Sequence, residues 1–376
     1  MEKRTRFLAA ARCQPVDRPP VWLMRQAGRY LPEYRELRAR HSFLECCKTS
    51  ALCAEITLQP LARLDVDAVI IFQDILTPLE PLGVELHIGD GGPRIGNPVQ
   101  SWADLERLRE VDLGEEMAFV GEAHREIRRR VGEGVAQIGF CGAPYTVATY
   151  LVEGATTKDH KIIKRMRWTD PALFTAVLTR LADGMASYLA MQAAAGADAL
   201  MVFDTWASDL TGPDFQEFAI PAVQRVIDGV RKATDVPVIY FPRGINGYWP
   251  EALASGADVL GFDHGIDLGQ VRDALGAAPP ALQGNLDPHS LYGPPEAIAG
   301  EVARIHASMK GQPGHIFNLG HGILPDVPVE GAQAFVQAVK ALGRLTPDQP
   351  STQGVLSGRG ETETSVAGAT GQGGGA

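Results

Sequence analysis

The apolar positions of the chain fall into short runs that alternate with longer segments of helical periodicity. Eight runs are rich in Val, Ile, Leu and Phe, a pattern typical of parallel strands that are buried on both faces. They cover residues 21–24, 68–72, 135–140, 199–203, 237–241, 258–262, 281–285 and 315–319. Apolar residues recur at helical spacing between them, as in residues 171–195 and 331–345. The alternation predicts an α/β fold, and the count of eight favours a single (β/α)8 TIM-type barrel over a doubly wound open sheet.

Two of the predicted strands are approached through nearly identical sequences, AAGADAL and ASGADVL. In each, a glycine, Gly196 or Gly256, is placed to end a helix in the left-handed conformation before the chain enters the sheet. This repeated connection is expected of the αβ loop in a repeating unit.

Two stretches do not belong to a minimal barrel. Residues 83–99 alternate around a Gly-rich turn and predict a β-hairpin inserted after the second strand, where it would fold over the mouth of the barrel. From residue 346 the chain is dominated by Gly, Ser, Thr and other polar residues, a composition that cannot bury enough surface to order itself. We therefore expect a catalytic barrel domain over residues 1–345 and a disordered tail over residues 346–376.

Composition and charge restrict the classes of partner. With 376 residues and 45% hydrophobic content, the chain is long enough for one large barrel domain. Its net charge of −10 disfavours nucleic acid and anionic membranes, so an anionic ligand needs a local basic patch. No apolar stretch reaches the roughly 18 residues of a membrane helix, and MEKRTR precedes too short an apolar stretch for a secretory signal. We expect a cytoplasmic protein, and five cysteines without a CxxC pair fit reduced thiols.

Polar residues follow the predicted strands at the end of the barrel where active sites are built. Part of this pattern is expected of any exposed loop. The residues are Arg25, Gln26 and Arg29 after the first strand, Asp74 after the second, Tyr150 after the third, Thr205 after the fourth, Arg243 after the fifth and His321 after the eighth.

Arg25 and Arg29 are the strongest candidates for binding an anion. Arginine suits planar, bidentate recognition of a carboxylate or phosphate, and two arginines four residues apart can face one side of a turn. Gly28 between them removes a side chain where a ligand would approach the backbone. The alternative is that the arginines form scaffold ion pairs, for which Glu33, Glu36 and Asp74 are available.

The remaining candidates also have two interpretations. Asp74 follows a buried strand, where a charge needs either a ligand or a compensating cation, but Asp is also a common cap of the next turn. His321 lies between two glycines instead of on an apolar helix face, and it could donate to a carboxylate in either charge state. Tyr150 could equally be a core aromatic residue.

Motifs for nucleotide, serine or zinc chemistry are absent from the sequence. The chain contains no GxxxxGK[ST] loop, GxGxxG helix opening, GxSxG elbow or HExxH motif. An enzyme that uses neither a metal nor an organic cofactor is the simplest interpretation.

Five segments together resemble the uroporphyrinogen decarboxylase family. They are MRQAGRYLPEYRELR (24–38), FQDILTPLEPLGVEL (72–86), GAPYTVATYLVEG (142–154), GNLDP (284–288) and NLGHGILPDVPVE (318–330), in the family's order and at similar spacing over residues 3–345. The resemblance implies a (β/α)8 barrel, usually a homodimer, that acts in cytosolic porphyrin biosynthesis without a cofactor. The reaction it implies removes four acetate carboxyls from uroporphyrinogen III and gives coproporphyrinogen III and CO₂.

The resemblance also assigns site residues at matching positions. Asp74 would contact the pyrrole N–H groups at the centre of the macrocycle. The other substrate contacts would be Arg25, Gln26, Ala27, Gly28, Arg29, Tyr150, Thr205 and His321. Gln73 stands where Ser often precedes the central Asp, and FDTWASDL replaces FDSWVGAL. Thr205 keeps the hydroxyl, but Ser208 and Asp209 place an additional acid near a site for a polyanion.

Decarboxylation needs a sink for the electrons left by CO₂, and a protonated pyrrole can be that sink without a cofactor. Asp74 would then stabilise the cationic ring, while Arg25 and Arg29 anchor carboxylates and one of them, or a water it orients, delivers a proton. Two alternatives remain open. A corrinoid-linked methyltransferase shares the architecture but needs a zinc thiolate site that the sequence lacks, and a tetrapyrrole carrier would bind without releasing CO₂.

Overall fold

The computed structural model describes residues 1–89, 91–276 and 279–343. The predicted tail, residues 346–376, lies outside the described residues. The domain boundary near residue 345 falls at their edge and stays a prediction.

A parallel sheet of seven strands forms the centre of the fold. Its order is β1-β4-β5-β6-β7-β8-β9, so every strand pairs with the next main-sheet strand along the chain. The strands are β1 (Ala68–Ile70), β4 (Ala136–Gly142), β5 (Ala199–Asp204), β6 (Val238–Pro242), β7 (Val259–Gly261), β8 (Ala281–Gln283) and β9 (His315–Ile316). Almost every residue in them is buried, as predicted for strands covered on both faces. Seven of the eight apolar runs are therefore confirmed as strands, in a TIM-like arrangement.

The first apolar run, residues 21–24, is not a regular strand, and this part of the prediction is wrong. Val21 makes a single parallel bridge to Phe317. Beyond it, the side-chain oxygens of Gln26 and Asn318 accept the N–H groups of Leu23 and Met24 at 3.0 and 2.9 Å. Side chains thus take the hydrogen bonds that a neighbouring strand would have taken.

Residues 20–22 nevertheless join the two edges of the sheet. On the β9 side, Phe317 N–H donates to the Pro20 carbonyl at 2.8 Å and Trp22 N–H to the Phe317 carbonyl at 3.3 Å. On the β1 side, Asp67 N–H donates to the Val21 carbonyl at 2.8 Å. The segment therefore stands where an eighth strand would stand.

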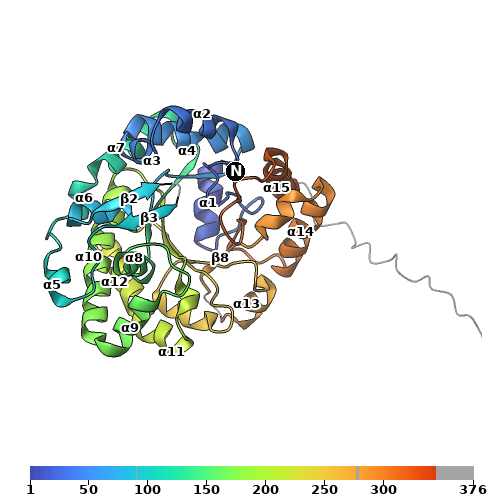
Figure 1. Ribbon diagram of the computed structural model, residues 1–376. Helices are drawn as coiled ribbons and strands as arrows, with labels where there is room; N and C mark the ends of the chain where they lie inside the picture. Colours follow the sequence, from blue (N-terminus) through green and yellow to red (C-terminus); the bar gives the residue numbers. More distant parts are fainter. Residues whose placement is uncertain (90, 277–278, 344–376) are drawn as a thin grey trace, which may run out of the picture. The chain divides into compact units, whose positions relative to one another are not determined.

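Helices surround the strands (Figure 1). The α-helices are α1 (Lys3–Ala11), α2 (Pro32–Arg40), α3 (Phe43–Lys48), α4 (Ser50–Leu64), α5 (Trp102–Glu106), α6 (Leu113–Glu116), α7 (Ala118–Val131), α8 (Pro144–Glu153), α9 (Lys161–Thr169), α10 (Pro171–Ala194), α11 (Gly212–Asp214), α12 (Ile220–Arg231), α13 (Leu268–Ala274), α14 (Pro295–Ser308) and α15 (Val329–Leu342). Shorter turns are η1 (Thr77–Leu82), η2 (Ala207–Asp209), η3 (Phe215–Ala219), η4 (Trp249–Ser255) and η5 (Pro288–Tyr292). The predicted helices at 171–195 and 331–345 correspond to α10 and α15. None of the described helices is long and apolar enough to cross a membrane.

The two repeated glycines have the conformation predicted for them. Gly196 follows α10 with φ +115°, and Gly256 follows η4 with φ +74°. Both values lie where residues with a side chain are strained. Each glycine turns the chain directly into the strand that follows.

The inserted hairpin is also present. Strands β2 (Leu86–Gly89) and β3 (Gly92–Ile95) pair in antiparallel register within the predicted range 83–99. They form a separate two-stranded sheet that follows β1 in the chain.

Candidate functional site

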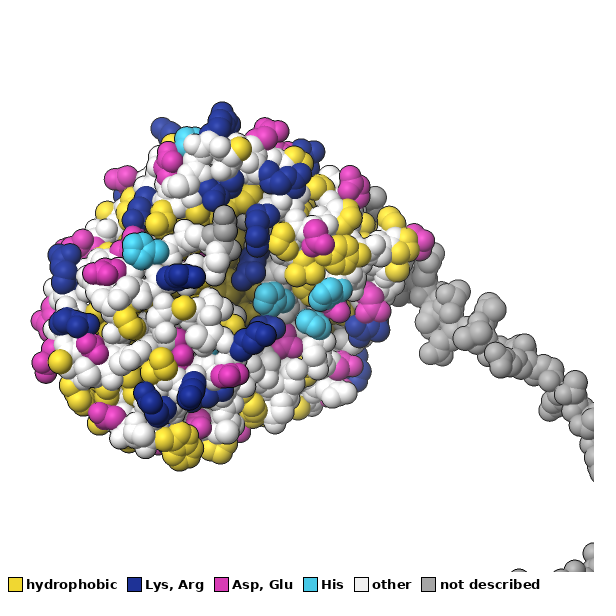
Figure 2. Space-filling view, viewed as in Figure 1, with side chains coloured by type: hydrophobic (Ala, Val, Ile, Leu, Met, Phe, Trp, Pro, Cys, Tyr) yellow, Lys and Arg dark blue, Asp and Glu magenta, His cyan; other side chains and the backbone are white. Residues whose placement is uncertain are grey.

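A cavity of about 1200 Å³ opens where the main strands end. Segments that follow β1, β4, β5, β6 and β9 contribute to its wall, together with the loop after residue 23 and the β2–β3 hairpin. Figure 2 shows a hollow on this face with Lys and Arg side chains beside it. The location agrees with the rule that barrel active sites lie at the carboxyl ends of the strands.

The cavity is strongly basic although the chain is acidic. Among the described residues, Asp74 is the only acid that lines it, whereas five arginines do so. The arginines are Arg25, Arg29, Arg35, Arg38 and Arg243. Although the whole chain has a net charge of −10, the cavity is locally positive and suits a ligand with several negative charges.

Arg25 and Arg29 are not scaffold ion pairs. Neither side chain forms a hydrogen bond or salt bridge within the described parts of the chain, and Glu33 pairs with Arg63 instead. Burial within the cavity wall, together with the charges of Arg29 and Arg243, lowers the pKa of Arg25 below its usual range. Two guanidinium groups are thus held where an anionic ligand could supply their missing partners.

The backbone around Arg25 is arranged to present the side chain. Arg25 has φ +61°, a value uncommon for a residue with a side chain, and strain of this kind clusters at functional sites. A Cβ atom on Gly28 would lie 2.9 Å from the Arg25 carbonyl oxygen, and one on Gly322 would lie 2.7 Å from Arg25 Cγ. Both glycines therefore make room for this arginine.

Within the segment 25–29, Ala27 and Gly28 also line the cavity, but Gln26 does not. Gln26 is fully buried; its amide oxygen accepts Leu23 N–H and its amide nitrogen donates to the Ala68 carbonyl at 3.1 Å. Both ends of the side-chain amide are thus used by the backbone, and a direct contact of Gln26 with the ligand stays a prediction.

Asp74 combines the two roles that the sequence allowed. Its Oδ1 accepts Leu76 N–H at 2.8 Å and so caps the following turn, yet the residue lines the cavity. Desolvation raises the pKa of the carboxyl, against the opposing effects of the Leu76 hydrogen bond and the Arg25 charge. Oδ2 has no donor in the described structure and is left for a ligand.

His321 lines the same cavity and is neutral at physiological pH. Desolvation and the charges of Arg25 and Arg243 lower its pKa to about 4. Of the two charge states that the sequence left open, the environment selects the uncharged imidazole.

Tyr150 and Thr205 complete the set of predicted residues that the cavity brings together. The Tyr150 ring packs 6.1 Å from that of Trp206, and burial raises the pKa of its phenol. Thr205 follows Asp204, a fully buried acid that accepts hydrogen bonds from Thr146 and Tyr240 at 2.6 and 2.9 Å. These bonds fix the end of β5 beneath the site.

The structure also places the three unusual residues. Gln73 lines the cavity, and its amide nitrogen donates to the Cys47 carbonyl at 2.6 Å. Asp209 forms a hydrogen bond with the ring of the buried His160 and does not line the cavity, so its carboxylate has a partner away from the ligand. Ser208 is exposed beside Gly244 and does not line the cavity either.

Three arginines of the cavity had no predicted role. Arg35 and Arg38 belong to the same basic segment as Arg29, and both donate to backbone carbonyls. Arg243 follows a predicted strand, but a single arginine after a strand carries little signal in a sequence. Its position becomes informative only when the sheet brings it to the same cavity.

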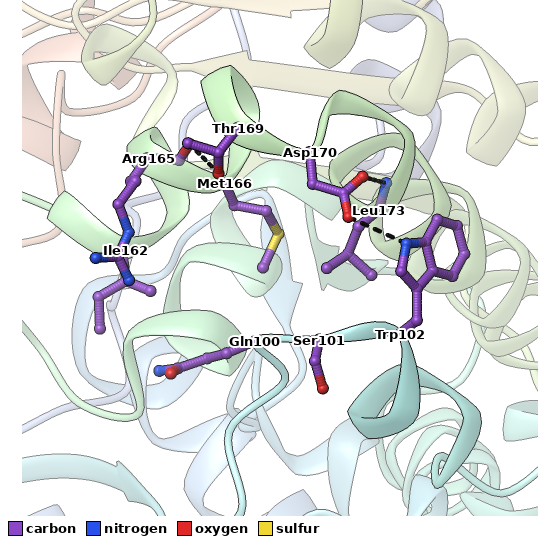
Figure 3. A pocket seen from close by; sticks show the side chains of 9 residues that line it. All are labelled: Gln100, Ser101, Trp102, Ile162, Arg165, Met166, Thr169, Asp170 and Leu173. Atoms are coloured by element: carbon purple, nitrogen blue, oxygen red, sulfur yellow. Dashed lines mark hydrogen bonds between the residues drawn. The ribbon is translucent and has the colours of Figure 1, made fainter.

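A second, smaller pocket of about 280 Å³ lies between α5 and the α9–α10 connection. Figure 3 shows the Trp102 indole N–H donating to Asp170, which also caps α10. Arg165 is its only cationic side chain among the described residues. This pocket is too small and too weakly charged for a large polyanion.

No group of three or more His, Cys, Asp or Glu side chains in the described residues is arranged to hold a metal ion. Four of the five cysteines are buried. Desolvation raises the pKa of the Cys53 thiol to about 12, which keeps it protonated and disfavours a thiolate ligand.

Comparison with known proteins gives consistent results. The family model "Uroporphyrinogen decarboxylase (URO-D)" matches residues 2–342. A uroporphyrinogen decarboxylase from Trichlorobacter lovleyi is 47% identical over 339 residues, which cover 90% of this chain and 99% of the relative. Another, from Escherichia coli O157:H7, is 46% identical over 346 residues, or 90% and 97% of the two chains. A solved methyltransferase from Methanosarcina mazei has a TM-score of 0.77 at 22% identity, covering 91% of this chain and 99% of its own. At that identity the likeness concerns the fold alone.

Proposed function

The chain belongs to the uroporphyrinogen decarboxylase family, and we infer that it removes CO₂ from the four acetate side chains of uroporphyrinogen III to give coproporphyrinogen III. It is a carboxy-lyase of porphyrin and haem biosynthesis that needs no added cofactor.

The observation that carries this inference is the composition of the large cavity. Among the described residues, five arginines and a single acid line about 1200 Å³, which suits a bulky tetrapyrrole with eight carboxylates. The apolar floor, with Phe140, Phe203 and Phe241, suits the faces of the macrocycle.

The pyrrole that bears the acetate acts as its own electron sink. Protonation of the ring carbon next to the one that bears the acetate makes the ring cationic, and loss of CO₂ then sends the electron pair of the broken C–C bond into the ring and leaves an exocyclic methylene. A second proton converts this methylene to methyl as the first proton leaves the ring carbon, which restores the pyrrole, so each CO₂ released consumes one proton. Asp74 faces the pyrrole N–H groups through its free oxygen and stabilises the cationic ring electrostatically.

The arginines bind carboxylates and control the proton. Arg25, whose pKa is lowered by desolvation, is a stronger acid than a free guanidinium, and it or a water it orients delivers the proton to the ring. Arg29 anchors a carboxylate nearby. Neutral His321, together with Tyr150 and Thr205, donates hydrogen bonds to the bound substrate.

We extend the same proposal to the whole molecule. Residues 20–22 occupy the eighth position of a (β/α)8 barrel, supported by their bonds to both edges of the sheet. The molecule is a homodimer in the cytoplasm, as the sequence resemblance implies; light scattering of the purified protein tests the dimer.

Two other functions have weaker support. The fold is shared with a methyltransferase, but a zinc thiolate centre has no candidate ligand group in the described residues. A tetrapyrrole carrier would need the same cavity, but it would not need a carboxylate beside the pyrrole nitrogens.

The decisive experiment is anaerobic incubation of the purified protein with uroporphyrinogen III, without cofactor or metal. Oxidised products are separated by their number of carboxyl groups. We expect products with seven, six, five and then four carboxyl groups to appear in that order. Tight binding without loss of carboxyls would identify a carrier and contradict the proposal.

A further inference from the structure

Arg243 is the one unpartnered arginine of the cavity that lies outside the segment 25–38. Arg35 and Arg38 donate to backbone carbonyls, whereas the side chains of Arg25, Arg29 and Arg243 have no hydrogen-bond or ion-pair partner within the described structure. Arg25 and Arg29 come from the loop before α2, but Arg243 follows β6, which lies three positions from β1 in the sheet. The unpartnered arginines of the cavity therefore come from two different parts of the fold.

The backbone of Arg243 is held rigidly by both neighbouring strands. Its N–H donates to the Asp204 carbonyl at the end of β5 at 3.0 Å. The next N–H, of Gly244, donates to Asp263 Oδ2 beyond β7 at 2.5 Å. Phe241, two residues earlier, also lines the cavity, as expected for side chains that alternate along a strand.

The charge of Arg243 needs a partner that the protein does not supply. The side chain is partly buried and lies close enough to Arg25 and His321 for its charge to act on both. A cation placed beside other cations without a counter-ion is unfavourable until an anion binds. Rigid placement together with a missing partner indicates a site prepared for a carboxylate of the ligand.

The chemistry of the proposed reaction selects the kind of carboxylate. A reacting acetate leaves as neutral CO₂, so a guanidinium bound to it would stabilise the ground state more than the transition state. The four propionates, one on each pyrrole, keep their charge from substrate to product. An anchor on a propionate stabilises ground state and transition state equally.

We propose that Arg243 is a specificity-determining residue that binds a propionate carboxylate of the tetrapyrrole from the β6 side of the cavity. This rests on the proposed function. Because such a contact binds the ground state and the transition state equally, its loss should change KM without changing kcat.

The test compares Arg243→Gln with the wild-type enzyme, using uroporphyrinogen III as substrate and its product coproporphyrinogen III as competitive inhibitor. Loss of a charge-assisted bond should raise KM by about 10- to 150-fold. The inhibition constant of the product should rise by the same factor, and kcat should stay within about twofold.

Arg231→Gln is the matched control. Arg231 ends α12, just before β6, so it lies at the other end of the same strand, where it is paired with Asp258. Its substitution removes the same charge and should leave both constants unchanged. If Arg243→Gln does not fold, Arg243→Lys replaces it in the same experiment. Lysine keeps the charge but cannot form the two parallel hydrogen bonds that a guanidinium makes to a carboxylate.

Two results would overturn the inference. Unchanged constants would mean that Arg243 touches no carboxylate, and a rise in KM alone would mean that it binds an acetate that the product has lost. Inactivity of the wild-type enzyme would instead count against the proposed function itself.

Discussion

Asp74 shows how one carboxylate can serve both the scaffold and the ligand. Its Oδ1 is used by Leu76 N–H, while its second oxygen remains available in the cavity. From the sequence, capping and ligand binding looked like competing interpretations. They are compatible because a carboxylate has two oxygens.

The first prediction concerns the charge of Asp74. Asparagine keeps an oxygen for Leu76 N–H, so Asp74→Asn should fold normally and still bind the tetrapyrrole. Removal of the charge that stabilises the cationic ring should lower kcat by about 10²- to 10³-fold. Single-turnover CO₂ release measures this step, and a rate near wild type would exclude the stabilising role.

The second prediction concerns the protonation of His321. Because its pKa is lowered to about 4, the imidazole is already neutral above about pH 5, and no further titration occurs near pH 6.5. His321→Gln should therefore reduce kcat/KM by a constant factor between pH 5.5 and 8.5. The control is the wild-type profile, which includes all substrate ionisations. Disappearance of an inflection near pH 6.5 in the variant would show that His321 titrates there.

The sequence predicted which residues meet at the site better than it predicted what each side chain does. Arg25, Asp74, Tyr150, Thr205 and His321 follow different strands, and parallel strands bring such positions to one end of the fold. The orientation of Gln26 and the charge state of His321 depend on contacts with distant residues. Sequence spacing carries no information about those contacts.

At the scale of elements, the loop that carries Arg25 and Arg29 is held in place by the side-chain amides of two buried residues. Asn318, beside β9, accepts Met24 N–H, and Gln26 joins Leu23 to Ala68 in β1. This explains why the run 21–24 was predicted as a strand. Its residues are as apolar and buried as a strand, but side-chain amides of two other segments replace the ladder of hydrogen bonds.

The third prediction tests this support. Gln26→Ala leaves a buried N–H and a buried carbonyl without partners, which should lower the free energy of unfolding by about 1 to 3 kcal/mol for each group. Because the segment that carries Arg25 and Arg29 is loosened, KM should also rise. Urea denaturation and steady-state kinetics measure the two effects.

Gln100→Ala is a suitable comparison for Gln26→Ala. Its side chain also donates to a backbone carbonyl, that of Val152, but it lines the smaller pocket. The Gln100→Ala variant should have a lower free energy of unfolding than the wild type and an unchanged KM. Equal kinetic effects in both variants would contradict a specific role for Gln26 in placing the arginines.

At the scale of the whole molecule, the ring of strands depends on a segment with few backbone bonds. Residues 20–22 join β9 to β1 through three backbone hydrogen bonds. The fully buried Asp67 reinforces this junction: it accepts Val21 N–H at 2.9 Å and forms ion pairs with Arg6 and Arg18 at 2.8 Å. One carboxylate thus connects α1, the loop before residue 21 and the start of β1.

The fourth prediction is that Asp67→Asn destabilises the fold strongly. It removes the buried carboxylate that pairs with both Arg6 and Arg18, and breaking a buried ion pair by removing one partner typically costs about 3 to 5 kcal/mol. Asp65→Asn is the control two residues away, because Asp65 is largely exposed, pairs with Lys3 and Lys340, and keeps its left-handed conformation as Asn. It should cost less than about 1 kcal/mol. Urea denaturation of both variants distinguishes the cases. Equal losses would mean that closure of the ring rests on its three backbone bonds and the surrounding apolar packing, and not on the buried charges.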